Sequence, residues 1–294
     1  MRIVTTIVEL RGLLDSARSE GRTVGVVPTM GALHAGHAAL VDRAADECDI
    51  VAVTVFVNPL QFAAGEDLDS YPRDLDGDVR VAGDHGAHLV FAPSEAEMYP
   101  AGRDRVLSEV RVAQLSEEME GASRPSHFAG VCTVVAKLFN IVGPARAYFG
   151  EKDFQQLTII RRMVDDLSFP VRVVGCPTVR EADGLAMSSR NVRLSPDHRA
   201  QAPVLAASLA DGAAAFTGGE RSADALVRIV EERLASAPDG QVDYVAVVDP
   251  VSLEPVGVVD GTSRLMVAVR FGGTRLLDNA ALADPPRPTG GPDA

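Results

Sequence analysis

The chain is organised by one run, Pro28-Thr29-Met30-Gly31-Ala32-Leu33-His34-Ala35-Gly36-His37. The apolar residues Val24 to Val27 precede this run, and the helical pattern Ala38 to Ala45 follows it. The apolar residues predict a buried parallel strand and the pattern after them predicts a helix, so the run is a strand-to-helix turn. In α/β sheets, such turns at the carboxyl ends of the strands are where ligands bind. We therefore expect an α/β fold in which a Rossmann-like parallel sheet places a ligand at this turn.

The chemistry of the turn suits a phosphate. Gly31 and Gly36 would let backbone N–H groups approach an anion, and the helix that opens near Gly36 adds its positive dipole end. His34 and His37 place two imidazoles at the same mouth, where each can donate to phosphate oxygens. The alternative is a pair of surface or capping histidines beside an ordinary loop. The spacing His-x-Gly-His resembles the nucleotidylyl-transfer signature of class I aminoacyl-tRNA synthetases and related adenylating enzymes, which indicates a class of chemistry but no substrate.

Composition narrows the class of protein. The chain has 294 residues, 46% of them hydrophobic and 23% charged, as in globular proteins with one large or two ordinary domains. A net charge of -13 argues against a broad nucleic-acid footprint, although local basic groups can still hold a nucleotide. Cys48, Cys132 and Cys176 are dispersed, which predicts reduced core thiols in a cytoplasmic protein. No apolar run approaches the length of a membrane span, so we expect no membrane partner. Because of the acidic net charge we also expect no nucleic-acid partner.

A second strand is predicted at Asp49 to Val57, completing a βαβ unit. It ends at Asn58 and Gln61, whose amides either contact a substrate or form a polar turn; the sequence favours neither. The following stretch, Asp67 to Asp78, is rich in carboxylates. It is either a solvated face, the commoner case, or the source of a Mg²⁺ ligand that faces a nucleotide phosphate.

A further strand is predicted at His88 to Ala92 and a helix at Cys132 to Val142. The loop Gly121 to Val131 leads into that helix. In this loop Arg124 offers a forked contact to a phosphate or carboxylate, His127 stands nearby, and Gly130 permits a close approach. A mobile lid without direct contact to a ligand is the alternative.

The logic of the first turn recurs between a strand at Ala147 to Phe149 and a helix at Leu157 to Leu167. A glycine again ends the strand, and charged residues open the helix: Gly150, Glu151, Lys152 and Asp153. Lys152 would neutralise phosphate, and Gln156 would face the same crevice as Asp153 because the two are three residues apart. Simple capping of the helix by Glu151 and Asp153 is the alternative.

A strand at Val171 to Val174 and a turn at 180–184 precede Met187-Ser188-Ser189-Arg190-Asn191, whose hydroxyls, cation and N–H groups suit a triphosphate. This segment resembles the second signature loop of class I synthetases with Arg in place of the usual Lys; a plain surface loop is the alternative. From Ser195 the pattern changes to helices at Ala200 to Phe216 and Ala223 to Ala235 and antiparallel strands at Val242 to Val248 and Leu265 to Val269. We expect a Rossmann-like domain over 1–184, a smaller α+β domain over 185–283, and a disordered tail over 284–294.

Taken in order, these motifs resemble the pantothenate synthetases, the pantoate:β-alanine ligases of bacteria. The resemblance spans nearly the whole chain, through Pro28 to His37, Phe56 to Phe62, Tyr71 to Arg73, Arg124 to Val131, Phe149 to Gln156, Pro177 to Asn191 and Thr274 to Asn279. Leu60 stands where many members have Met, and Asp74 where Thr is frequent. The change near Asp74 leaves the alignment of the metal aspartate open, with Asp78 the better candidate.

The resemblance implies a homodimer and a two-step ligation: pantoate is adenylated by Mg-ATP, and β-alanine then displaces AMP. It implies catalytic roles for His34, His37 and Lys152, with His37 as the usual candidate for proton donor. It also implies three sets of binding residues: for ATP, 30–37 together with Gly150, Glu151, Lys152, Asp153, Val179, Met187, Ser188, Ser189 and Arg190; for pantoate or β-alanine, Asn58, Gln61, Arg124, His127, Asp153 and Gln156; and for Mg²⁺, Asp78. Another His-x-Gly-His nucleotidylyltransferase and a nucleotide sensor that has lost catalysis are the alternatives.

Overall fold

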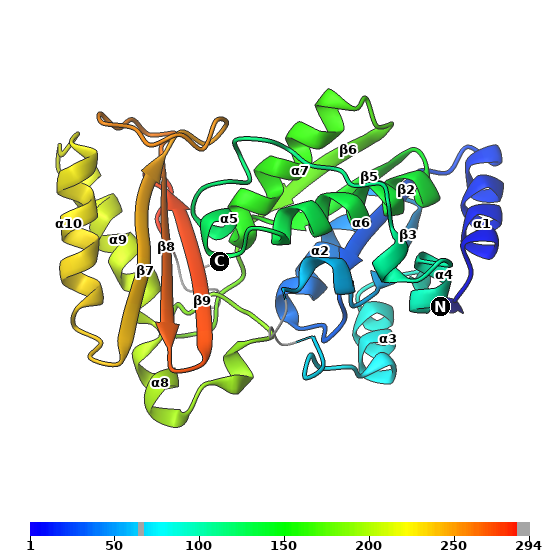
Figure 1. The fold of residues 1–294 in the computed structure, drawn as a ribbon, viewed down its shortest axis with the longest axis horizontal. Helices are drawn as coiled ribbons and strands as arrows, with labels where there is room; N and C mark the ends of the chain where they lie inside the picture. Colours follow the sequence, from blue (N-terminus) through cyan, green and yellow to red (C-terminus); the bar gives the residue numbers. More distant parts are fainter. Residues whose placement is uncertain (64–67, 287–294) are drawn as a thin grey trace. The chain divides into compact units, whose positions relative to one another are not determined.

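The computed structural model describes residues 1–63 and 68–286. The chain divides into two compact units, shown in Figure 1. Unit 1 comprises Met1–Glu151 and Gln155–Pro177, and unit 2 comprises Lys152–Phe154 and Thr178–Ala294. Of the expected tail, residues 287–294 lie outside the described residues, and Asp284 donates its N–H to the Ala281 carbonyl at 3.0 Å. The domain boundary expected after residue 184 stays a prediction, and the division by contacts falls after Pro177.

Unit 1 is built on a parallel six-stranded sheet, as expected. Its strands lie in the order β1-β4-β3-β2-β5-β6. They are β1 (Arg2–Val4), β2 (Val24–Thr29), β3 (Ile50–Val55), β4 (Leu89–Phe91), β5 (Ala145–Gly150) and β6 (Val171–Cys176). The near-continuous apolar runs of β2 and β3 are explained by burial on both faces of the sheet.

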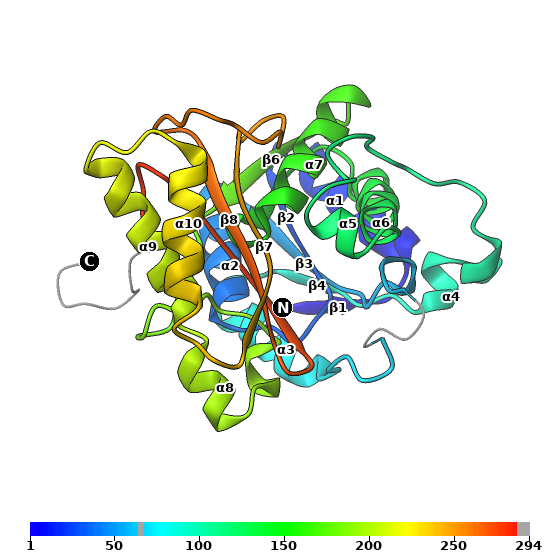
Figure 2. The same cartoon turned by 60° about the vertical axis from the view of Figure 1, so that its left-hand side comes forward.

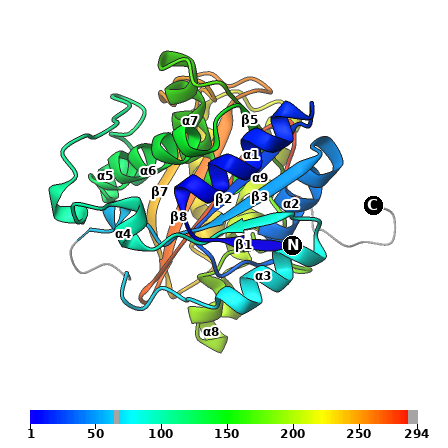
Figure 3. The same cartoon turned by 90° about the vertical axis from the view of Figure 1, so that its right-hand side faces the viewer.

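Helices cover both faces of this sheet. Side chains of α1 (Ile7–Ser19), α6 (His127–Val142) and α7 (Phe154–Asp166) share one core cluster with the strands. Side chains of α2 (Ala35–Glu47) and α3 (Leu75–Asp84) share a second cluster with β3, and Figure 3 shows α1 and α2 on opposite sides of the strands. The short elements are α4 (Glu95–Met98), α5 (Glu120–Ser123), η1 (Pro59–Gln61), η2 (Arg103–Arg105) and η3 (Glu151–Asp153). The sheet is therefore doubly wound, as the strand and helix patterns indicated.

Two segments of unit 1 differ from expectation. The acidic stretch contains α3, which the sequence analysis did not predict. The buried residues of this helix are Asp78 and Ala82, so it lacks the stripe of large apolar residues that marks a helix in a sequence. The expected loop 121–131 is largely helical, since α5 occupies its start and α6 begins at His127 rather than at Cys132. Residues 64–67, which include Asp67, lie outside the described residues.

Unit 2 packs helices on an antiparallel sheet of order β7-β8-β9. The strands are β7 (Gly240–Val248), β8 (Arg264–Phe271) and β9 (Thr274–Ala281), and the helices are α8 (Pro196–Gln201), α9 (Val204–Thr217) and α10 (Ala223–Leu234), after the short η4 (Asn191–Arg193). Figure 2 shows α9 and α10 side by side along the strands, with which they form one core. Arg180 and Asp278 form an ion pair at 2.6 Å whose side chains are 4% and 1% exposed. The expected small α+β part is confirmed, with β9 as an additional strand.

Candidate functional site

The point where the strand order of the unit 1 sheet reverses lies between β2 and β5. From β2 the chain crosses to β3 on one side, whereas from β5 it crosses to β6 on the other. Gly25 pairs with Arg146 and Val26 with Ala147, so the carboxyl ends of these two parallel strands meet at the same sheet edge. Open α/β sheets bind ligands at such a reversal. The two predicted glycine turns, after Thr29 and at Gly150, therefore both start from the edge that suits a ligand.

The two histidines of the first turn form the amino-terminal cap of α2. His34 is the N-cap residue, and its Nδ1 accepts the Gly36 N–H at 3.1 Å, while Nδ1 of His37 accepts the His34 N–H at 3.4 Å. The two ring centroids lie 4.2 Å apart. A neutral imidazole whose Nδ1 accepts a hydrogen bond carries its proton on Nε2. The capping alternative is therefore confirmed for the Nδ1 atoms of both rings, which places both imidazoles at the start of α2.

We expected the backbone N–H groups of the turn to approach an anion, but three of them donate hydrogen bonds within the protein. Gly31 donates to Thr29 Oγ1 at 3.1 Å, and Ala32 and Leu33 donate to the Asp78 carboxylate at 3.2 and 2.7 Å. These three N–H groups are therefore engaged within the protein, contrary to the expectation that they would approach an anion. Burial raises the pKa of the Asp78 carboxyl above its ordinary value, although the N–H groups of Leu33 and Ala32 lower it in part.

Asn58 and Gln61 lie together at the end of β3. Asn58 Oδ1 accepts the Leu60 N–H at 3.3 Å and the Tyr99 hydroxyl at 2.7 Å, and Asn58 Nδ2 donates to Gln61 Oε1 at 3.1 Å. Asn58 is 1% exposed. Its amide thus serves the polar turn, while Gln61 also donates from Nε2 to the Met30 sulfur at 3.0 Å. Met30 is therefore tied to Gln61, and the amide of Gln61 borders the histidine turn.

Arg124 and His127 meet at the same carbonyl. Arg124 Nη2 lies 3.3 Å and His127 Nδ1 lies 3.0 Å from the Gln61 carbonyl oxygen. Gly130 explains how α6 packs so closely, because a Cβ built there would lie 2.2 Å from the Leu60 carbonyl oxygen. The close approach predicted at Gly130 is thus an approach of protein backbone. The three residues fix the position of Gln61.

Unit 2 holds the lysine segment Lys152–Phe154. Asn279 Nδ2 donates to the Lys152 carbonyl at 2.8 Å, Arg264 lies over the Phe154 ring at 3.9 Å, and Arg264 Nε donates to Asn279 Oδ1 at 2.8 Å. Lys152 Nζ lies 3.4 Å from Asp153 Oδ1. The sequence analysis did not assign Asn279 or Arg264 to the site, because no local pattern shows that β8 and β9 support this segment.

The predicted hydroxyl and cation loop is also held within unit 2. Met187 donates its N–H to the Val179 carbonyl at 2.9 Å, and Arg190 donates its N–H to Ser188 Oγ at 3.2 Å. Asn191 Nδ2 donates to Glu181 Oε1 at 2.8 Å. This arrangement gives the loop a fixed shape at the start of η4.

The structure places the predicted site residues in two sets. Unit 1 contains Met30, Gly31, Ala32, Leu33, His34, Ala35, Gly36, His37, Asn58, Gln61, Asp78, Arg124, His127, Gly150, Glu151 and Gln156, and unit 2 contains Lys152, Asp153, Val179, Met187, Ser188, Ser189 and Arg190. Their roles toward ligands stay predictions.

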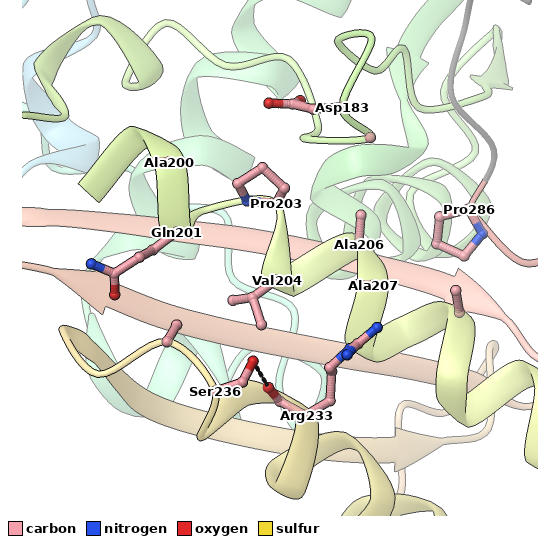
Figure 4. A pocket seen from close by; sticks show the side chains of 13 residues that line it. Asp183, Ala200, Gln201, Pro203, Val204, Ala206, Ala207, Arg233, Ser236 and Pro286 are labelled. Carbon is pink, nitrogen blue, oxygen red and sulfur yellow. Dashed lines mark hydrogen bonds between the residues drawn. The ribbon is translucent and has the colours of Figure 1, made fainter. Parts of the chain in front are cut away.

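Two other features of the molecule bear on where a ligand could bind. Among residues 1–63 and 68–286, no group of three or more His, Cys, Asp or Glu is arranged to hold a metal ion. A cavity of about 480 Å³ in unit 2 is lined in part by small side chains of α8 and α9, such as Ala200, Val204 and Ala207 (Figure 4). Arg233 at its wall is paired with Asp211 at 3.0 Å, and the cavity contains none of the predicted site residues.

Comparisons with known proteins agree on one family. Residues 2–281 match the family model described as pantoate-beta-alanine ligase. The pantothenate synthetase of Sinorhizobium medicae is 52% identical over 96% of this chain and 97% of its own, and that of Heliobacterium modesticaldum is 52% identical over 95% and 98%.

Solved structures show the same likeness. The crystal structure of pantothenate synthetase from Thermus thermophilus is similar with a TM-score of 0.90 at 50% identity, covering 96% of this chain and 99% of that one. The pantoate-beta-alanine ligase of Francisella tularensis, complexed with beta-gamma ATP and beta-alanine, is similar with a TM-score of 0.77 at 30% identity, covering 98% and 100%. Across the described part of the chain, every helix is too short or too polar to span a bilayer.

Proposed function

Because the chain belongs to the pantoate-β-alanine ligase family, we propose that its paired imidazoles at the β2–α2 turn serve the ATP-dependent condensation of pantoate with β-alanine. The observation that carries the proposal is the geometry of His34 and His37. Both rings use Nδ1 to cap α2, at the sheet edge that suits a ligand, and an imidazole that accepts through Nδ1 carries its proton on Nε2, the atom that would donate to a phosphate.

The reaction proceeds in two balanced steps. A carboxylate oxygen of pantoate attacks the α-phosphorus of ATP, and pyrophosphate leaves with the electrons of the broken P–O bond. The amine of β-alanine then attacks the acyl carbon of pantoyl adenylate, AMP leaves, and the amine gives up a proton. Both steps develop negative charge on phosphate oxygens, so positioning and charge stabilisation are what the protein must supply.

The residues of unit 1 suit the first step. The two Nε2–H groups stabilise charge on the α-phosphate, with His37 as proton donor, and the amino-terminal end of α2 adds its dipole. Gln61, fixed by Arg124 and His127, holds pantoate together with Gln156, and Met30 packs alongside. In this assignment the side-chain amides of Gln61 and Gln156 bind pantoate, and the buried Asn58 does not contact it.

Further contacts to ATP and β-alanine come from residues near the second glycine turn and from the hydroxyl and cation loop. Lys152, Ser188, Ser189 and Arg190 neutralise and bind the phosphates, as the chemistry of ammonium, hydroxyl and guanidinium groups allows. Val179 lines the adenine pocket, and Asp153 and Arg190 contact the ammonium and the carboxylate of β-alanine. The bonds from Asn279 to Lys152 and from Arg190 to Ser188 support these roles by fixing the backbone.

We propose that Mg²⁺ enters with ATP. The predicted ligand Asp78 does not fit a metal well, since it is 3% exposed, each of its carboxylate oxygens accepts a backbone N–H group, and no group of three potential ligands surrounds it among the described residues. When bound, Mg²⁺ offsets phosphate charge through phosphate oxygens and water, which needs few protein ligands. The buried free cysteines Cys48, Cys132 and Cys176 support a cytoplasmic location. The family resemblance supports a homodimer, and light scattering of the purified protein would test this oligomeric state.

The decisive experiment measures AMP and pantothenate with purified protein, ATP, Mg²⁺ and pantoate, with and without β-alanine. We expect both products only when every component is present, and pantoate-dependent exchange of pyrophosphate into ATP without β-alanine. His37→Ala should lower turnover by orders of magnitude while its unfolding midpoint stays close to that of the wild type. Intact ATP binding without any pantoate-dependent exchange would instead indicate another acyl substrate or a nucleotide sensor.

A further inference from the structure

Asp78 and the histidine turn form one unit of structure although they lie 45 residues apart in the chain. Asp78 Oδ2 accepts the Ala32 N–H at 3.2 Å, and Oδ1 accepts the Leu33 N–H at 2.7 Å. The residue is 3% exposed and sits in the first turn of α3. A buried carboxylate that binds two backbone N–H groups is an anchor for the backbone that donates them.

The conformation of the turn explains why a carboxylate is needed. Gly31 and Ala32 both have positive φ, at 83° and 52°. Successive backbone N–H groups in a turn can point into one concavity, which binds anions. In this chain the Asp78 carboxylate occupies that concavity. For Ala32, a residue with a Cβ, left-handed backbone is unfavourable and persists only when the surroundings hold it.

The glycine of the turn is explained by the same contact. A Cβ built on Gly31 would lie 2.8 Å from Asp78 Oδ2 and 3.1 Å from Val55 Cγ1. Asp78 therefore leaves no room for a side chain at position 31. The anchored segment ends at Leu33, and the next residue is His34, the cap of α2.

We propose that Asp78 is a positioning residue: its buried carboxylate binds the N–H groups of Ala32 and Leu33, so that the turn keeps the left-handed conformation that presents the imidazoles of His34 and His37, and it does not ligate the metal. The inference rests on the proposed function for its effect on the rate, but the anchoring itself concerns the structure of the turn alone. Removing the carboxylate would release the turn and displace the rings from the α-phosphate.

The first test compares Asp78→Asn with Asp76→Asn, which removes an equal charge from an exposed position in the same helical turn. The Asn side chain has one acceptor oxygen and one NH2 donor, so it can accept only one of the two backbone N–H groups and places a donor against the other. We expect kcat to fall about 10- to 100-fold in Asp78→Asn, because a displacement near 1 Å costs rates of this order, and to stay within about twofold in Asp76→Asn. The Mg²⁺ concentration for half-maximal rate should change less than twofold in both. A large rise in that concentration with rescue by Mn²⁺ would overturn the proposal in favour of a metal ligand.

The second test needs no variant. Hydrogen exchange of the wild-type peptide 28–37 should show slow amides at Ala32 and Leu33 without nucleotide, and added Mg²⁺ alone should leave them unchanged. Exchange as fast as in an unstructured loop, or exchange that Mg²⁺ accelerates, would refute the anchor. An inactive wild-type enzyme with protected amides would instead refute the proposed function and leave the anchor standing.

A double-mutant cycle tests the geometry directly. Gly31→Ala adds a methyl group against Asp78 Oδ2. The loss in free energy of unfolding that this change causes should be smaller in an Asp78→Ser background than in the wild type, because the backbone strain is common to both backgrounds and cancels. Equal costs in the two backgrounds would show that the carboxylate does not occupy this space.

Discussion

Adding a methyl group at Gly130 should lower both the stability of the fold and the use of pantoate, and the two effects can be measured separately. In Gly130→Ala the new Cβ would lie 2.2 Å from the Leu60 carbonyl oxygen and 2.6 Å from Gln61 Cα, both backbone atoms of η1. Atoms at their optimal separation lie about 3.5 Å apart or more, so η1 must move by about 1 Å. Overpacking of this kind costs about 1–3 kcal/mol, or roughly 2–12 °C in the midpoint of a unit of this size.

The same shift carries Gln61 with it. Because a misplacement of about 1 Å can cost about 100-fold in rate, kcat/KM for pantoate should fall by this order. The KM for ATP should change far less, since none of the residues assigned to ATP alone lies in η1. Calorimetry and pantoate-dependent pyrophosphate release measure the two effects.

The matched control is Gly12→Ala, in the exposed middle of α1, where a built Cβ meets nothing within 4 Å. Alanine should raise stability there by about 0.5–1 kcal/mol and leave the kinetics unchanged. A Gly130→Ala enzyme with wild-type midpoint and wild-type dependence on pantoate would show that the close approach of α6 to η1 is wrong.

Three further changes test other contacts. Gln61→Ala should raise the pantoate concentration for half-maximal exchange much more than that of ATP, whereas equal shifts would make the side chain structural. Asp278→Ala leaves the buried Arg180 guanidinium without its carboxylate and should cost about 3–5 kcal/mol in urea unfolding, and a loss below about 1 kcal/mol would contradict the buried pair. The hydrogen bond from Arg199 lowers the pKa of Asp183, so its stabilisation is complete above the ordinary pKa and is lost as pH falls through the lowered value. The stability gap between wild type and Asp183→Asn should therefore be constant near pH 7 and shrink below about pH 4, and a gap that persists to lower pH would refute this linkage.

The parts of the fold that were predictable from sequence are those in which local pattern and burial agree. The strands β2 and β3 are apolar because both faces of the sheet are covered, and α1 shows its buried stripe at helical spacing. The strand β1 was missed because it has three residues, two of them exposed. The strand β9 was missed because Arg275, Asp278 and Asn279 interrupt its apolar pattern, although Asp278 and Asn279 are buried by their polar partners.

The site follows the same division. The position of His34 and His37 was predictable because the strand-to-helix turn that holds them is local, and their role toward a ligand stays a prediction. The anchoring partner of their turn, Asp78, lies in a distant helix, and the acidic stretch around it was compatible with either a metal ligand or a solvated face. The support of Lys152 by Asn279 joins residues 127 positions apart. Pairings of this kind are set by tertiary packing, which a single sequence does not display.

The strand order also has a consequence for how the chain is made. The strand β2 must accept β5, which begins at Ala145, more than a hundred residues later, and β1 pairs with β4 only after Phe91 has been synthesised. Until then one edge of β2 offers unpaired backbone groups beside apolar side chains, a surface prone to association with other chains. Sheets with such long-range pairings fold slowly. A ribosome-bound chain that stops short of Ala145 thus exposes the β2 edge that the complete chain covers.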